Sequence, residues 1–259
     1  MQYFIIDAFS ERTFQGNPAG VCVMDRPLPD ELMQKIAFEN NLSETAFLLK
    51  SNDAYTLRWF TPKVEVGLCG HATLATSFVV MNHIDPSTHI VNFNTRSGVL
   101  TVSKKEDLYI LDFPSRKCVP CQTPGSLEEA LGTRVYGTYV ANSMVAVLEN
   151  ETVVKSLSPD FQKLAAFKDV RAVIVTAKGD ICDFVSRFFA PNIGINEDPV
   201  TGSAHCTLIP FWSERLQKKS LYARQLSQRG GELFCEDCGE RVKIGGKAAL
   251  YLKGEILMA

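Results

Sequence analysis

The sequence predicts an α+β fold of two similar, pseudo-symmetric domains, each a mostly antiparallel sheet or barrel wrapped round one central helix. Three features of the 259-residue chain support this prediction. Strand patterns outnumber helix patterns, one short motif occurs twice about half a chain length apart, and each copy opens a helix that is apolar on nearly every side. A helix without a polar face has to be buried on all sides, so each one needs a sheet around it.

Short apolar and aromatic runs bounded by turn residues predict strands in both halves of the chain. In the first half they cover 3–9, 19–24, 45–50, 55–61, 89–94, 98–103 and 108–113. In the second half they cover 135–139, 144–148, 172–176, 181–189, 241–244 and 248–252. An amphipathic helix is expected over Asp30–Asn40, with acidic residues near its start and an apolar face that includes Met33 and Ile36.

The duplicated motif divides the chain into domains. Leu68-Cys69-Gly70-His71-Ala72-Thr73 resembles Val200-Thr201-Gly202-Ser203-Ala204-His205, and buried helices are expected over 72–81 and 204–212. Pro210 is expected to kink the second helix. We place the domains at 1–115 and 116–259, with the proline-rich stretch 113–124 as the linker, and leave open whether the last strand returns to the first domain.

Charge and hydropathy exclude several classes of function. The formal net charge is −2, which provides no global field to recruit nucleic acid or an anionic membrane. The longest charge-free apolar stretch, 66–83, is broken by Gly, Cys, His, Thr and Ser, so no membrane span is expected. The first residues, MQYFIIDAF, lack a basic region and predict a strand, not a signal peptide, so we expect a cytoplasmic protein.

The eight cysteines are expected to be reduced thiols. Two pairs have CxxC spacing, Cys118/Cys121 and Cys235/Cys238, and two such knuckles could supply four thiolates to one zinc ion. The pairs lie far outside the spacing of a zinc ribbon, and neither sits in a Gly-flanked knuckle pair. We therefore expect no metal at these cysteines.

The two loop-to-helix junctions have a direct chemical use. A helix N-terminus presents unpaired backbone N–H groups and the positive end of the helix dipole, which suit a carboxylate or an oxyanion. Two such ends pointing into one cleft would hold a small carboxylated substrate and stabilise charge that develops on it. The structural alternative is that Gly70 and Gly202 only permit tight turns.

Polar residues beside the junctions are candidates for chemistry. His71 and Ser203 begin the helices, and a histidine at a helix N-terminus should have a lowered pKa and stay neutral. Ser203 could instead be an N-cap, and Asp198 a turn residue before a proline. Glu44 enters an apolar strand, where it is either a surface residue or a general base with a raised pKa.

Motifs along the whole chain carry a family resemblance. In order they are Gly16-Asn17-Pro18-Ala19-Gly20-Val21, Ser43-Glu44-Thr45-Ala46-Phe47, Arg58-Trp59-Phe60-Thr61-Pro62 leading to Glu65-Val66, Cys69-Gly70-His71-Ala72-Thr73, and Glu197-Asp198-Pro199-Val200-Thr201-Gly202-Ser203-Ala204-His205. The 242–257 region with Gly245-Gly246 closes the series. The order and spacing resemble the PhzF family of phenazine-biosynthesis isomerases.

The resemblance implies a diaminopimelate-epimerase-like fold and a proton shift within the substrate that needs neither metal nor cofactor. Glu44 matches the glutamate that moves the proton, and His71, Asp198 and Ser203 match the family's assisting polar residues. Substrate-binding positions are expected at Asn17, Gly70, Ala72, Thr201 and Gly202. We therefore expect an isomerase that acts on a small carboxylated metabolite, with a homodimer as the commonest assembly.

Cysteine usage separates the chain from racemases of the same fold, which place a cysteine at each helix N-terminus. Cys69 precedes Gly70, but no cysteine stands just before Gly202, so a two-thiol mechanism lacks its second base. The alternatives are a racemase or epimerase that uses Cys69 with Glu44 or Asp198, and a non-catalytic protein that binds a small ligand or a protein partner. One local departure is CEDCGE at 235–240, where a Gly- and Arg-rich turn is expected.

Overall fold

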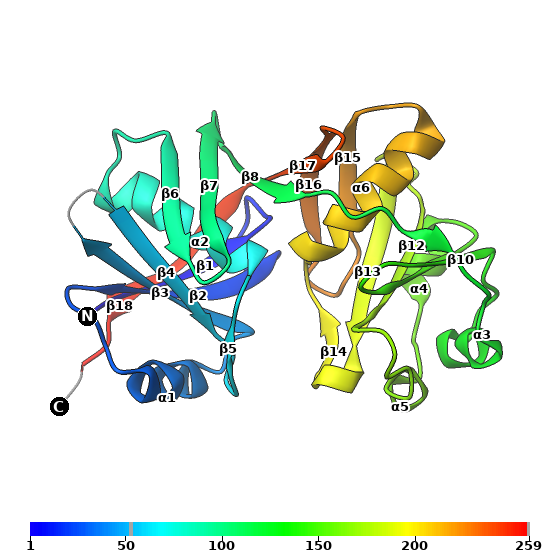
Figure 1. Ribbon diagram of the computed structural model, residues 1–259, viewed down its shortest axis with the longest axis horizontal. Coiled ribbons are helices and arrows are strands. Elements are labelled where there is room, and N and C mark those ends of the chain that lie inside the picture. Colours follow the sequence, from blue (N-terminus) through cyan, green and yellow to red (C-terminus); the bar gives the residue numbers. More distant parts are fainter. Residues whose placement is uncertain (52–53, 258–259) are drawn as a thin grey trace. The chain divides into compact units, whose positions relative to one another are not determined.

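The computed structural model describes residues 1–51 and 54–257 (Figure 1). Contacts divide the chain into two compact units, Met1–Asp112 with Gly245–Ala259 and Phe113–Ile244. The boundary between Asp112 and Phe113 lies slightly before the expected one at 115/116. The C-terminal segment groups with the first unit, because its strand pairs antiparallel with the first strand of the chain, the return that the sequence left open.

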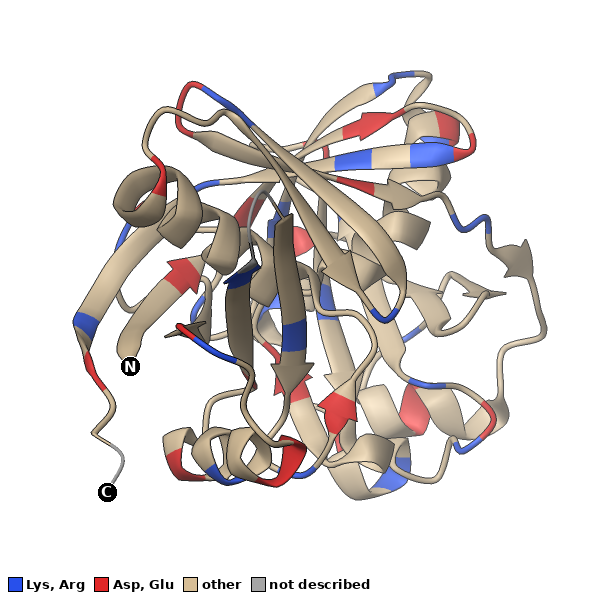
Figure 2. Cartoon of the chain, turned by 60° about the vertical axis from the view of Figure 1, so that its left-hand side comes forward, with Lys and Arg blue, Asp and Glu red and all other residues tan. Residues whose placement is uncertain are grey.

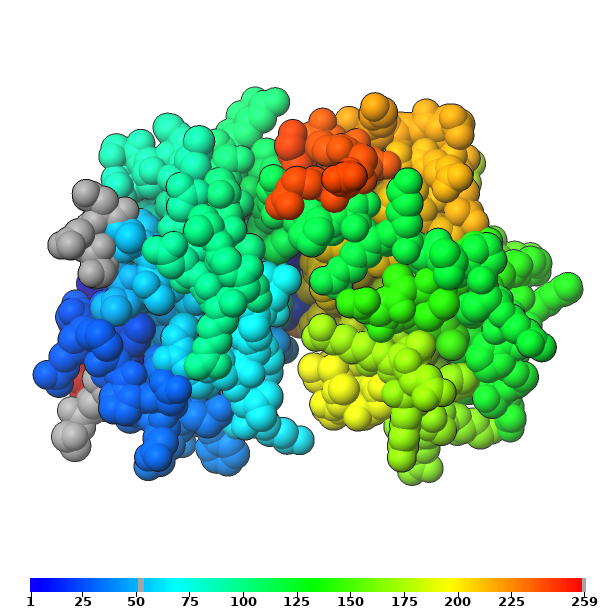
Figure 3. Space-filling view, viewed as in Figure 1, coloured from blue at the N-terminus to red at the C-terminus, as the bar shows by residue number. Residues whose placement is uncertain are grey.

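Among its described residues, the first unit is a sheet with three helical segments. Its strands are β1 (Gln2–Ala8), β2 (Asn17–Met24), β3 (Glu44–Ser51), β4 (Ala54–Phe60), β5 (Glu65–Val66), β6 (Ile90–Thr95), β7 (Gly98–Lys105), β8 (Leu108–Pro114) and β18 (Ala248–Glu255). Its helical segments are α1 (Asp30–Asn40), α2 (Gly70–Val79) and the π-helical turn η1 (Val80–Ile84). Figure 3 shows the hairpin of β6 and β7 in blue-green on the face of this unit that is turned to the viewer.

The second unit has a similar content of strands and helices. Its strands are β9 (Val119–Pro120), β10 (Gly137–Val140), β11 (Met144–Val147), β12 (Val173–Lys178), β13 (Phe184–Ala190), β14 (Ile195–Asp198), β15 (Ser220–Gln225), β16 (Gly231–Asp237) and β17 (Arg241–Gly246). Its helices are α3 (Gly125–Leu131), α4 (Glu151–Ser156), α5 (Phe161–Leu164), the 3-10 turn η2 (Pro191–Ile193) and α6 (Gly202–Leu216).

The two units repeat one pairing scheme. In the first, β1 is antiparallel to β2, β2 parallel to β3, β3 antiparallel to β4, β4 antiparallel to β5 and parallel to β6, and β6 antiparallel to β7. In the second, the same relations hold in the same order for β10, β11, β12, β13, β14, β15 and β16. The helix of the duplicated motif follows β5 in one unit and β14 in the other. The predicted fold class, two similar α+β halves, is therefore confirmed.

The helix α2 is buried along nearly its whole length, as its composition predicts. It contacts the four neighbouring strands β18, β1, β2 and β3. Its buried hydroxyls donate back to the carbonyl four residues earlier, as Thr76 does to Ala72 and Ser77 to Thr73, so they need no water. At Gly246, the last residue of β17 and part of the first unit, a Cβ atom would collide with the Phe9 ring and crowd Leu74 of α2. Glycine there permits close packing of strand and helix.

Both helices of the repeat differ from the predicted ranges at their ends. The α2 helix begins at Gly70 and ends at Val79, after which η1 continues with a bond from the Asp85 amide to the Val80 carbonyl. The α6 helix extends from Gly202 to Leu216 and continues past Pro210. Both helices therefore begin at the glycine of the motif, two residues earlier than predicted.

Other elements were not predicted from the sequence. These include β15 and β16, in which buried residues alternate with exposed or half-buried ones, the short strands β5, β9 and β14, the helices α3, α4 and α5, and the turns η1 and η2. The expected linker 113–124 belongs to the second unit, since Val119 pairs with Val140 through β9. Within the described part of the chain, no helix combines the length and apolar character that a membrane span needs.

Candidate active site

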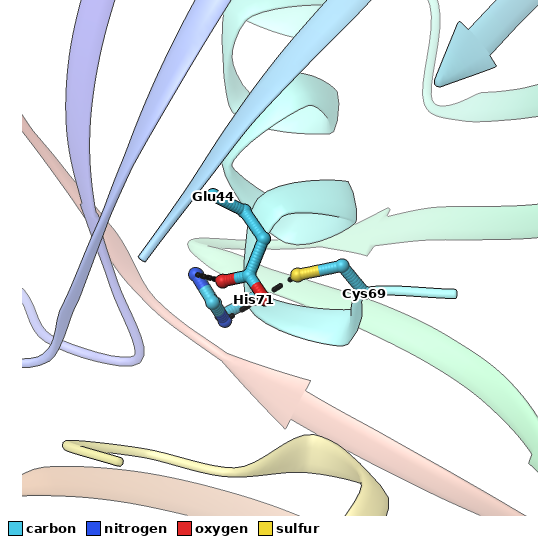
Figure 4. Close-up of side chains that lie close together, drawn as sticks. All are labelled: Glu44, Cys69 and His71. Carbon is cyan, nitrogen blue, oxygen red and sulfur yellow. Dashed lines mark hydrogen bonds and ion pairs between the residues drawn. The ribbon is translucent and has the colours of Figure 1, made fainter. Parts of the chain in front are cut away.

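The candidate site of the first unit lies where β2, β3 and α2 begin. Asn17 opens β2 and Glu44 opens β3, and these parallel strands are in register, with Ala19 opposite Glu44. Parallel strands begin at the same edge of a sheet, so both polar side chains lie at one edge. The N-cap residue Cys69 and the helix residue His71 reach this edge from α2. Figure 4 shows Glu44, Cys69 and His71 converging.

Three contacts join these side chains through the imidazole of His71. Asn17 Nδ2 lies 3.2 Å from His71 Nδ1, and Cys69 Sγ lies 3.6 Å from the same nitrogen. On the other side of the ring, His71 Nε2 lies 3.3 Å from Glu44 Oε2. An amide nitrogen can only donate, so His71 Nδ1 accepts, and the neutral ring then carries its proton on Nε2, facing Glu44.

Burial makes His71 a neutral group. The side chain is 6% exposed, and desolvation lowers its pKa to about 3. The sequence predicted a neutral histidine because of its place at a helix N-terminus. The pKa is lowered as predicted, but the cause is burial. The Glu44 carboxylate is 15% exposed, so it is sheltered yet reachable. The site therefore places a carboxylate that can accept a proton next to a buried neutral imidazole.

The corresponding junction of the second unit is organised by Gln225. This fully buried amide accepts from the Thr201 backbone N–H at 2.9 Å and donates to the Asp198 carbonyl at 2.7 Å. Thr201 Oγ1 in turn donates to Asp198 Oδ2 at 2.6 Å. The turn between β14 and α6 is thus fixed from inside, with the Asp198 carboxylate oriented by Thr201.

The next turn of α6 carries a second buried histidine. His205 is fully buried, its Nδ1 lies 2.9 Å from the Thr201 carbonyl, and burial lowers its pKa to about 4. A carbonyl can only accept, so Nδ1 carries the proton. Ser203 is half-buried at the second position of the helix, next to this turn.

The predicted residues fall into two groups, one in each unit. Asn17, Glu44, Gly70, His71 and Ala72 lie in the first, and Asp198, Thr201, Gly202 and Ser203 lie in the second. Among the described residues, neither N-cap residue caps its helix with its own side chain, so Cys69 and Thr201 leave the first helical N–H groups to other partners.

Two features were missed by sequence reasoning. One is Gln225, which belongs to a strand that the sequence did not predict. The other is a forked ion pair in each unit: Arg58 with Glu65 joins β4 to β5, and Arg187 with Glu197 joins β13 to β14. Both forks are bidentate, with nitrogen–oxygen distances between 2.7 and 2.9 Å. They fasten the short strand that leads into each buried helix.

Charged residues are otherwise mixed in sign. Figure 2 shows acidic and basic positions interspersed in the view it presents. The balance agrees with the net charge of −2. Outside the candidate site, Lys247 contacts both Glu11 and Asp107 at the surface of the first unit. Such exposed pairs contribute little to stability and do not indicate a ligand.

Comparisons with known proteins agree with the motifs. The family model described as phenazine biosynthesis-like protein (PhzC-PhzF) matches residues 6–254. An uncharacterized isomerase of Pseudomonas aeruginosa is 49% identical over 98% of this chain and 97% of its own. A PhzF-family phenazine biosynthesis protein of Enterococcus faecalis has a crystal structure with a TM-score of 0.98, at 50% identity over 99% of both chains.

A more distant structure shows how widely the fold is shared. A hydroxyproline epimerase of Agrobacterium vitis has a TM-score of 0.62 at 12% identity, covering 98% of this chain and 91% of that chain. Identity at this level shows a common fold alone. The predicted likeness to the epimerase fold is therefore confirmed.

Proposed function

Because the chain belongs to the phenazine biosynthesis-like PhzC-PhzF family and is an isomerase, we propose that it moves a proton within a small carboxylated metabolite, with Glu44 as the general acid and base. The observation that carries the proposal is the contact between the sheltered Glu44 carboxylate and the buried neutral His71. A carboxylate in such surroundings can take a proton from one carbon and return it to another.

The roles of the other residues follow from their contacts. His71 Nε2 lies 3.3 Å from Glu44 Oε2, from where it can orient the carboxylate when substrate binds, and Nδ1 of the same ring contacts Asn17. Backbone N–H groups at Gly70 and Ala72 suit the substrate carboxylate, because they open a buried helix. We assign Asp198, Ser203, Thr201 and Gly202 to substrate binding and charge stabilisation. No metal or cofactor takes part in this scheme.

A racemase or epimerase is the second candidate, and one observation favours it. Cys69 Sγ lies 3.6 Å from His71 Nδ1, so a thiol stands beside the same imidazole that Glu44 contacts. Two groups on opposite faces of one carbon would invert it, whereas one carboxylate that carries a proton between two carbons changes the position of a double bond. The products distinguish the two reactions.

The test is incubation of the protein with small carboxylated metabolites in deuterated water, followed by NMR and mass spectrometry. The proposal predicts deuterium at a carbon-bound position together with a rearranged product. Deuterium with inversion and no rearrangement would favour the racemase. Tight binding without any exchange, across ligands that the protein demonstrably binds, would favour a non-catalytic binding protein.

We also propose that the protein acts as a cytoplasmic homodimer. The proposal is supported by the frequency of two-fold symmetric assemblies among soluble enzymes. Multi-angle light scattering of the full chain tests the homodimer. Fractionation of cells that express the protein tests its cytoplasmic location. A monomeric mass at micromolar concentration would contradict the first.

A further inference from the structure

The site of the first unit contains the donor set of a metal centre. Glu44, Cys69 and His71 each offer one ligand atom, and these three atoms all lie within 4.8 Å of one another. They come from a carboxylate, a thiol and an imidazole, the ligand types that zinc takes in proteins. All three residues are sheltered from solvent, so they are not an ordinary exposed acidic cluster.

One small tetrahedral ion would have to draw the three donor atoms closer together than they lie now. Zinc bonds of roughly 2.0–2.3 Å place tetrahedral ligands roughly 3.3–3.7 Å apart. Two contacts already fall in this range, His71 Nε2 to Glu44 Oε2 at 3.3 Å and Cys69 Sγ to His71 Nδ1 at 3.6 Å. They involve opposite nitrogens of the ring, so an ion would use one nitrogen and draw the third donor inward.

The surroundings of His71 support ligation. Asn17 Nδ2 lies 3.2 Å from His71 Nδ1, and a side-chain amide can present its nitrogen or, after rotation, its oxygen. It can therefore support the ring in either tautomer, as outer partners of metal-binding histidines do.

We propose that a thiophilic divalent cation, Zn²⁺ above all, binds Glu44, Cys69 and His71 and inhibits the protein reversibly. The ion occupies the carboxylate that serves as the general base, so proton transfer stops while the ion is bound. Three protein ligands leave one position of a tetrahedral ion for water or a carboxylate. The proposal that the ion binds depends only on the three ligand atoms. The proposal that it inhibits proton transfer also rests on the proposed function of Glu44.

The binding test uses metal-free full-length protein and Co²⁺, a spectroscopic substitute for zinc, followed by displacement with Zn²⁺. We expect one equivalent of Co²⁺ to give a near-ultraviolet thiolate charge-transfer band that Zn²⁺ abolishes. The band should vanish in Cys69→Ser and persist in Cys238→Ser and in the double variant Cys118→Ser/Cys121→Ser, which are matched thiol controls. Absence of the band in the wild type, or its survival in Cys69→Ser, would overturn the proposal.

A second variant keeps the thiol and removes another ligand. Glu44→Gln should retain the charge-transfer band but lower the Co²⁺ affinity by at least about tenfold, because a neutral amide is a poorer ligand than a carboxylate. An unchanged affinity would exclude Glu44 from the metal site. The measurement needs no substrate, so it is independent of isomerase activity and does not require Cys69→Ser to fold.

The inhibition test adds Zn²⁺ to the deuterium-exchange reaction and then removes it with a chelator. We expect exchange to stop with one bound equivalent and to return after chelation. Full exchange by the zinc-loaded protein would overturn the inhibitory role and leave the binding result standing. If Glu44→Gln itself exchanges at the wild-type rate, the proposed function fails, whatever the metal does.

Discussion

The N-termini of α2 and α6 are held by the same kinds of contact, but different side chains lie beside them. Each helix follows a short strand fastened by a bidentate Arg–Glu fork. In each, the residue four positions after the N-cap bonds back to the N-cap carbonyl, Thr73 to Cys69 and His205 to Thr201. These shared contacts make both junctions rigid, as two copies of one structural unit.

The difference lies in the side chains that face each junction. In the first unit, β3 begins with Glu44, whereas β12, its counterpart in the pairing scheme, begins with Val173. The second junction holds Asp198, but Thr201 and Gln225 already bond to that residue. The comparison shows a sheltered carboxylate beside a buried histidine at the first junction and an aspartate already bonded by its neighbours at the second. This difference is why the proposal places the proton-transferring base in the first unit.

Breaking the two Arg–Glu forks should have the largest effects on stability. The loss should be greater for the fork of the second unit than for that of the first. Arg187 is nine-tenths buried and also donates to the Val154 and Leu157 carbonyls, so Arg187→Met leaves a carboxylate and two carbonyls unpaired. We expect a loss of about 3–5 kcal/mol in the free energy of unfolding. Arg58→Met should lose only about 1 kcal/mol, because Arg58 is more exposed and Glu65 keeps Arg96 as a partner.

Urea unfolding of both variants measures this difference. Equal losses would contradict the view that the fork of the second unit is the more deeply buried one. Arg26→Met, which changes an exposed arginine of the first unit, is the matched control and should leave the unfolding midpoint unchanged.

The buried histidines should make both units sensitive to acid. Burial lowers the pKa of His71 to about 3 and of His205 to about 4, whereas an unfolded histidine titrates near about 6.5. The unfolded chain therefore binds more protons between these values, so stability is complete above about pH 6.5 and is lost as the pH falls. At pH 5 each histidine should cost about 2 kcal/mol.

Denaturation at pH 7 and pH 5 separates the contribution of the second unit. In His205→Gln the amide can still donate to the Thr201 carbonyl but does not titrate, so the stability difference between the two pH values should shrink by about 2 kcal/mol. A difference equal to that of the wild type would show that His205 is protonated in the folded protein.

Removing the buried amide of the second junction should have a smaller effect. Gln225→Leu leaves the Thr201 N–H and the Asp198 carbonyl without their partner, at a cost of about 1–3 kcal/mol. Substrate affinity should weaken as well, because the turn that holds Asp198 loosens. Gln162→Leu, at an exposed position of α5 in the same unit, is the control. Unchanged stability and affinity in Gln225→Leu would remove this amide from the account.

Much of this arrangement could be predicted from sequence because it depends on local pattern. The repeat at Gly70 and Gly202 and the apolar helices after it led directly to the duplicated fold. Asn17, Glu44 and His71 were found because they lie in motifs. By contrast, Gln225 contacts Thr201 across 24 residues of sequence, and the Arg187 fork crosses two strands. Such contacts depend on which residues of neighbouring strands lie opposite one another. The sequence did not predict β15 and β16, so it could not place Gln225 next to Thr201.

The central claim is that Glu44 transfers the proton. The most direct test measures exchange in deuterated water at saturating substrate for Glu44→Gln and for a control, Glu39→Gln, which changes an exposed glutamate of α1. The amide keeps the shape and hydrogen-bonding capacity of the carboxylate but cannot accept a proton near neutral pH. We expect Glu44→Gln to fold and bind substrate while exchange at the substrate carbon falls by at least ~10²–10⁴-fold. Glu39→Gln should exchange like the wild type. Undiminished exchange in Glu44→Gln would contradict the account and make Cys69 the leading base.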